Sequence, residues 1–164
     1  MFLNNRNNRK KGLSLVEVII ATAIISTSMI YIAKSYSDFV FLSSANTARV
    51  QATFLLDEAV EAVKTLRGES WSKISTLNTA TPYYLVWDAN LNKWTLTLTP
   101  SVIDGVFTRT LEFLPVNRDV NFNIATVGTA DAGSRQVSIS VSWSDHGVTV
   151  TKSIGMYIFN ILNN

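Results

Sequence analysis

The sequence predicts an α+β fold in which one long N-terminal α-helix packs against an antiparallel sheet of four to five strands. Two observations lead to this prediction. Residues 13–67 contain neither glycine nor proline, and apolar residues recur at helical spacing in the second half of this stretch. Beyond Trp71, apolar and polar residues alternate in short runs separated by turn-forming residues, which is typical of antiparallel strands.

The composition is that of a folded protein with the length of one domain. The chain has 164 residues, of which 47% are hydrophobic, and it contains no cysteine, which excludes disulfides, thiolate metal ligands and cysteine nucleophiles. Its formal charge is +2, but four basic residues lie within residues 1–12, so the remainder carries +2 − 4 = −2. Because no basic cluster remains after residue 12, we do not expect nucleic acid as a partner.

Residues 13–33, LSLVEVIIATAIISTSMIYIA, form an apolar run with a single charge. As a helix this run spans ~32 Å at ~1.5 Å per residue, which matches the core of a bilayer. Basic residues precede the run, so the positive-inside rule places the N-terminus in the cytoplasm and the bulk of the chain outside. We therefore expect a single-pass membrane protein anchored in the lipid bilayer.

Two residues at the start of the run are unusual for a simple anchor. Glu17 would lie ~6 Å inside the apolar layer, where a carboxylate costs up to a few kcal/mol unless it finds a partner. Gly12 separates the basic cluster from the run, and a flexible glycine is readily presented in extended form to a protease. The junction KKG/LSLVEV resembles the N-terminal signature of type IV prepilins and pseudopilins, and the resemblance covers residues 9–34.

This resemblance implies a set of processing and assembly steps. Residues 1–12 would be a leader that a prepilin peptidase removes by cutting between Gly12 and Leu13, and Leu13 would become the N-methylated terminus. Glu17 would pair with the terminal amine of a neighbouring subunit, and a buried carboxylate and a buried ammonium are much less costly together than apart. The implied partners are the peptidase, other pilin or pseudopilin subunits and an inner-membrane assembly platform, and the final location is a filament.

Retractile pili, secretion pseudopili and competence pili share this signature. The sequence departs from it in two ways: Leu13 stands where many mature pilins begin with phenylalanine, and residues 13–33 lack the proline found in many major pilins. The later segment ATFLLDEAVEAVKTLRGESWSKI is similar to that of bacterial minor pilins of the kind that resemble secretion pseudopilins, which favours a minor rather than a major subunit.

The helix is predicted to continue over residues 34–67 and to pack on a head formed by residues 68–164, with Gly68 as the C-terminal cap. One helical stripe is apolar and should cover the sheet: Ala52, Leu55, Leu56, Ala59, Val63 and Leu66. The opposite face is charged and is predicted to be solvated, with Glu61 and Lys64 paired at i, i+3: Asp57, Glu58, Glu61, Lys64 and Arg67.

Two hairpins are predicted in the head. Residues 83–87 and 94–99 form the first, and residues 137–143 and 148–154 form the second. The second should point Val137, Ile139, Val141 and Trp143 inward. A further strand is expected at residues 106–114, a long irregular loop at 115–135, and a continuation of the last strand into MYIFNIL.

The head shows no arrangement typical of a catalytic site, so we expect neither enzyme activity nor a cofactor. His146 lies in the turn SDHG and lacks spaced metal-ligand partners, so no metal site is expected. Asp119 and Asp131 are an alternative pair of calcium ligands, but a solvated loop is favoured. Among the tryptophans, Trp94 and Trp143 are predicted core residues, whereas Trp71 and Trp87 are assigned neither to the core nor to a binding site.

Two functions from different classes follow. The first is a structural subunit, a minor pilin or pseudopilin, of a type IV pilus-like filament. The second is a membrane-tethered binding module, an adhesin or DNA receptor, whose leader is never removed. The state of the bond between Gly12 and Leu13 discriminates between them.

Overall fold

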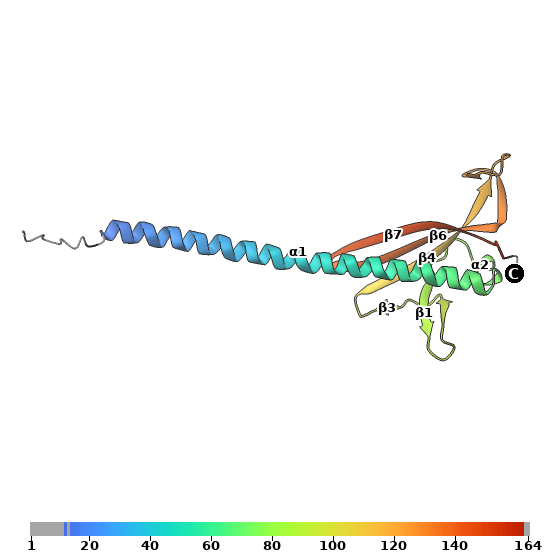
Figure 1. The fold of residues 1–164 in the computed structure, drawn as a ribbon, viewed down its shortest axis with the longest axis horizontal. Helices are drawn as coiled ribbons and strands as arrows, with labels where there is room; N and C mark the ends of the chain where they lie inside the picture. Colours follow the sequence, from blue (N-terminus) through green and yellow to red (C-terminus); the bar gives the residue numbers. More distant parts are fainter. Residues whose placement is uncertain (1–11, 13, 163–164) are drawn as a thin grey trace, which may run out of the picture. The chain divides into compact units, whose positions relative to one another are not determined.

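The computed structural model describes residues 12 and 14–162, and it divides the chain into two compact units, Met1–Ser44 and Ala45–Asn164. Most of the predicted leader and Leu13 lie outside the described residues. The first unit contains the N-terminal part of helix α1, Leu15–Glu69, and the second contains the rest of α1 and all strands (Figure 1). No proline interrupts α1 over its 55 residues, which agrees with the predicted long helix.

The prediction that Gly68 caps α1 is wrong. Gly68 has a helical conformation, and α1 ends one residue later. The chain then turns directly into the short helix α2, Ser72–Ser75, with Trp71 at its N-cap position. The Trp71 side chain is buried, and its indole N–H donates a hydrogen bond to the carbonyl oxygen of Ala132 at 3.2 Å.

Every strand pairing in the head is antiparallel. Strands β1 and β2 form a two-stranded sheet, and the larger sheet has the order β3-β4-β6-β7 with β5 also pairing with β4. The strands are β1 Tyr84–Asp88, β2 Lys93–Thr97, β3 Val102–Ile103, β4 Phe107–Arg118, β5 Ile124–Ala125, β6 Thr129–Asp145 and β7 Val148–Phe159. Both predicted hairpins are present, and the first forms a small sheet of its own that an isolated bridge between Tyr83 and Leu111 connects to the larger one.

The predicted irregular loop at residues 115–135 is largely wrong, because strands β4 and β6 extend into it. Their register shifts between Pro115, which lies opposite Arg135, and Val116, which lies opposite Asp131. Proline cannot donate to a ladder and is tolerated where the pairing is irregular. Only the shorter stretch between β4 and β6, with β5 inside it, remains a loop.

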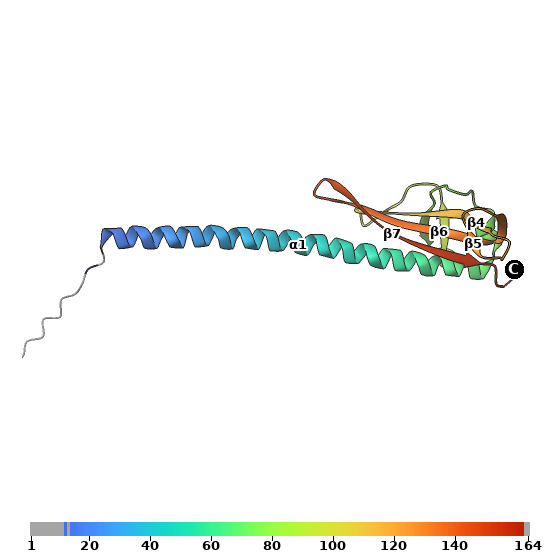
Figure 2. The ribbon, with the colours of Figure 1, turned by 90° about the horizontal axis from the view of Figure 1, so that it is seen from above.

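The core lies between the C-terminal part of α1 and one face of the larger sheet. Figure 2 shows that part of α1 running along the sheet next to β7. The predicted stripe is buried except for Leu55, which is half-buried, and it packs on the predicted inward residues of β6 together with Leu111 and Phe113 of β4. Since a fully buried valine, leucine or phenylalanine contributes ~1.5–3 kcal/mol, this interface is the main source of stability of the head.

Candidate functional site

The N-terminal end of α1 places Gly12 just before the helix. Gly12 is exposed and has no regular secondary structure, and at the start of α1 the N–H of Val18 donates to the carbonyl oxygen of Ser14 at 3.2 Å. A Cβ atom added at Gly12 would meet nothing within 4 Å. The packing of the chain itself therefore does not require glycine here, and a requirement would come from an enzyme that binds this segment.

Glu17 lies in the first turn of α1 and is exposed. A negative charge is favourable there, because the first backbone N–H groups of a helix lack intrahelical partners and the helix dipole is positive at this end. Within the described part of the chain, no side chain pairs with the Glu17 carboxylate.

The N-terminal part of α1 exposes an unbroken apolar surface. Within the described residues, α1 is long enough and apolar enough to cross a membrane, and none of its most apolar stretch is buried. Thr22, Ser26, Thr27 and Ser28 do not interrupt this character, because each hydroxyl donates to a carbonyl oxygen three or four residues earlier at 2.7–3.0 Å. This part of α1 therefore offers an apolar surface to lipid or to other helices.

His146 is placed in the β6–β7 turn, as predicted. It adopts a left-handed backbone conformation with φ +52°, and its Nδ1 lies 2.6 Å from Oδ1 of the neighbouring Asp145. The residues that the structure describes contain no group of three or more His, Asp or Glu side chains that could hold a metal ion.

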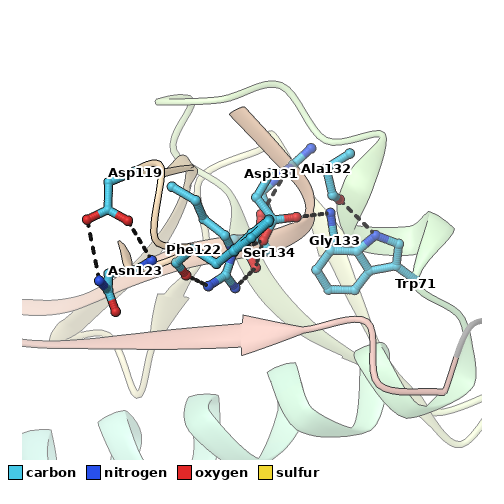
Figure 3. Close-up of polar contacts among 10 residues, drawn as sticks. Trp71, Asp119, Phe122, Asn123, Asp131, Ala132, Gly133 and Ser134 are labelled. Atoms are coloured by element: carbon cyan, nitrogen blue, oxygen red, sulfur yellow. Dashed lines mark hydrogen bonds and ion pairs between the residues drawn. The ribbon is translucent and has the colours of Figure 1, made fainter. Parts of the chain in front are cut away.

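Asp119 and Asp131 each have separate partners in the structure (Figure 3). Asp131 accepts hydrogen bonds from the Ser134 hydroxyl and from Nε of Arg118, both at 2.6 Å, and these contacts lower the pKa of Asp131. Asp119 accepts backbone N–H groups of Asn123 and Asn121 at 2.9 Å, which lower the pKa of Asp119. Both carboxylates therefore organise the loop between β4 and β6.

An ion pair between α1 and the sheet, buried only on the arginine side, escaped the sequence analysis. Arg109 of β4 is only 3% exposed, and its guanidinium donates to Oε2 of Glu58 at 2.5 Å and to the carbonyl oxygen of Leu55 at 3.0 Å. Glu58 therefore does not belong to a purely solvated face, whereas Glu61 and Lys64 are paired at 2.7 Å as predicted. The alternating pattern of FTRTLEFL could have predicted the arginine side of this pair, because it places Arg109 on the inward face of the strand between Phe107 and Leu111.

The structure assigns the two undecided tryptophans. Trp71 belongs to the core cluster, and Trp87 is 46% exposed with its ring packed edge-on against Trp94 at a centroid distance of 5.2 Å. Trp143 is buried and Trp94 packs against the core, as predicted.

A comparison with protein-family models matches residues 7–33 to the prokaryotic N-terminal methylation motif. Comparisons with curated proteins and with solved structures find no match. The matched segment contains Gly12, Leu13 and Glu17 and runs into the exposed apolar part of α1. Such a motif implies processing by a prepilin peptidase and assembly with other pilin subunits in general, and it is consistent with a membrane anchor. With this motif at residues 7–33 and a long apolar helix that fits it, the chain carries the signature of the type IV prepilins.

Proposed function

We propose that this chain is a structural subunit, a minor pilin or pseudopilin, of a type IV pilus-like filament that is assembled from the inner membrane. The observation that carries the proposal is the methylation motif at residues 7–33, which continues directly into the exposed apolar part of α1. The chain acts through its contacts with other subunits and has no catalytic role.

Maturation begins with a cut between Gly12 and Leu13 by a prepilin peptidase, followed by methylation of the new amine of Leu13. The exposed position of Gly12, before the start of α1, supports access of a peptidase to this bond. Removal of residues 1–12 changes the formal charge from +2 to −2 and takes away the basic segment that holds the N-terminus on the cytoplasmic side.

Assembly then places the apolar part of α1 among the helices of other subunits. Glu17 pairs with the amine of a neighbour's first residue, which offsets the cost of placing either charge in an apolar environment. The large apolar side chains of this part of α1, for example Ile24 and Ile32, would be covered by the same step.

The N-terminal sequence and intact mass of the protein from its native membrane fraction test the proposal. A chain that begins at Leu13 with one added methyl group is expected. A chain that keeps residues 1–12 in cells with an active peptidase would overturn the proposal in favour of a permanently tethered binding module. The matched control is Gly12→Ala, which the structure accommodates without a clash and which should remain in the membrane uncut.

A further inference from the structure

The loop between β4 and β6 holds large apolar side chains in solvent. Val120 is 93% exposed, Phe122 79% and Val127 85%, all within eight residues of one another. Single exposed apolar residues are common on protein surfaces, but a group of them at the tip of one loop is typical of a contact surface.

Hydrogen bonds fix the conformation of this loop, so the exposure does not come from a lack of structure. The backbone N–H of Asp119 donates to the carbonyl oxygen of Asn123 at 2.9 Å, and the Asp119 carboxylate accepts N–H groups of Asn121 and Asn123. Figure 3 shows the carboxylate of Asp119 bonded to Asn123. A guanidinium nitrogen of Arg118 donates to the carbonyl oxygen of Phe122 at 2.8 Å.

Phe122 itself has φ +64°, a left-handed conformation that a bulky residue rarely adopts and that costs of order 1 kcal/mol or more. The loop therefore keeps Phe122 exposed at a conformational cost. A contact with another molecule would compensate for that cost.

A second surface of the same head has the complementary character. Leu66, Leu77, Trp94 and Leu96 line an open cleft of about 300 Å³ between the end of α1 and the β1–β2 hairpin, and Lys73 and Lys93 lie at its rim. Lys73 pairs with Glu69, and no acidic side chain lines the cleft. The loop at residues 119–130 is apolar and acidic, because Asp119 is its one ionisable side chain. It therefore complements the cleft, which is apolar and basic.

We propose that the 119–130 loop of one copy of this chain inserts Val120 and Phe122 into the cleft of a second copy, with Asp119 close to Lys93 at the rim. The inference rests on the proposed function, in the form of a pseudopilin that assembles next to copies of itself, and adds to it a contact between heads.

The two surfaces are different, and this decides the kind of assembly that they can build. In Figure 1 the end of the sheet that carries β5 projects on one side of α1 and the β1–β2 hairpin lies on the other. A copy that inserts its loop in one neighbour therefore keeps its own cleft open for another. Such a heterologous contact repeats from subunit to subunit, and it generates an open row where the rotation between neighbours does not close a ring.

The contact is weak on its own, because it buries little more than two apolar side chains, far less than a stable interface of ~1,600 Å². It acts between copies that the packing of α1 already holds next to each other, where the effective concentration of the loop at the cleft is high.

Cysteine crosslinking in the full chain tests the inference, since the natural sequence has no cysteine. Val120→Cys in the loop is combined with Thr95→Cys, a half-buried residue that lines the cleft, in cells that assemble the filament. Mild oxidation should give a ladder of dimers, trimers and larger products. Each single variant should stay monomeric. The matched control pairs Val120→Cys with Leu91→Cys, which is 59% exposed on the same hairpin but does not line the cleft, and it should give no ladder.

Three results would overturn the inference: dimers from Val120→Cys alone, equal ladders with Leu91→Cys, or monomers only from the pair with Thr95→Cys. The sheared filament fraction from the same cells shows whether a lack of crosslinks contradicts the head contact alone or the proposed function as well. If the filament fraction contains the protein as monomers only, the head contact is overturned. If the protein is confined to the membrane fraction as monomers, the result counts against both the head contact and the proposed function.

Discussion

The guanidinium of Arg109 lies 2.5 Å from the carboxylate of Glu58 and joins β4 to α1 inside the head. Arg109 is nearly completely buried, whereas the Glu58 side chain is 45% exposed. The guanidinium also lies over the ring of Trp94, with 5.5 Å between Cζ and the ring centroid, so it connects the helix with both sheets. A buried cation with one carboxylate partner makes the head sensitive to changes at Glu58.

Glu58→Gln should lower the free energy of unfolding by about 1–2 kcal/mol, because it leaves the Arg109 charge buried without a full counter-charge, and the partial exposure of Glu58 keeps the effect below that of a fully buried pair. Urea denaturation of the full chain in detergent, followed by tryptophan fluorescence, measures it. Glu61→Gln is the control, since the exposed pair with Lys64 should contribute at most about 0.5 kcal/mol.

A cavity in the core between α1 and the larger sheet should destabilise the head. Phe113 is 0% exposed at the centre of the core, so Phe113→Ala should lower the free energy of unfolding by about 3–5 kcal/mol. Phe54 is 67% exposed on α1, and Phe54→Ala should change it by less than about 0.5 kcal/mol. Equal effects of the two variants would contradict the assignment of the helix faces.

Much of this architecture follows from local sequence patterns. The apolar stripe of α1 and the alternation of residues 137–143 are each set within one element, so the burial of Val63 and Val141 could be predicted from spacing alone. The methylation motif is likewise contiguous in sequence. The pairing of Glu58 with Arg109 is different, because 51 residues separate the partners and no local pattern on α1 distinguishes Glu58 from its charged neighbours.

The extension of β4 and β6 was hidden for a related reason. Pro115 and Gly133 are typical of loops, but here they lie at a register shift, where the three residues of β6 between Asp131 and Arg135 have no partner in β4. The shift breaks the alternation that identifies a strand. Beyond the register shift, the ion pair between Arg118 and Asp131 joins β4 to β6. The sequence next to either residue does not indicate this partner.

The Asp131 carboxylate gives the loop a pH dependence of definite sign. Its pKa in the folded chain is below the ordinary value of 3.8, because the Ser134 hydroxyl and the Arg118 guanidinium stabilise the ionised form. The contribution of the ionised Asp131 carboxylate to stability is therefore complete at pH values above the ordinary pKa, and it is lost as the pH falls through the lowered pKa. Asp131→Asn should be less stable than the natural chain at about pH 7, and the gap should close towards about pH 2. A gap that widens on acidification would contradict the assigned partners.

Gly128 is needed for the close approach of the loop to the end of β4. A Cβ atom at this position would lie 2.1 Å from the carbonyl oxygen of Arg118, which is backbone and cannot move aside. Gly128→Ala should therefore speed hydrogen exchange at residues 119–127 and remove the crosslink between Val120→Cys and Thr95→Cys. Gly155→Ala on β7, where a Cβ atom meets nothing within 4 Å, should leave both unchanged.

Glu17 separates membrane insertion from assembly. Glu17→Ala removes the single charge from residues 13–33, so the variant should insert in the membrane at least as well as the natural chain. It should be lost from sheared filaments, because the amine of a neighbouring subunit then lacks its counter-charge. Glu17→Gln keeps the size of the side chain but not the charge, and it should fail in the same way if charge pairing is the cause. Immunoblots of membrane and filament fractions measure both variants, with Ser28→Ala as a control in the same helix. Normal incorporation of Glu17→Gln would show that the side chain acts by its shape or hydrogen bonding, and not by its charge.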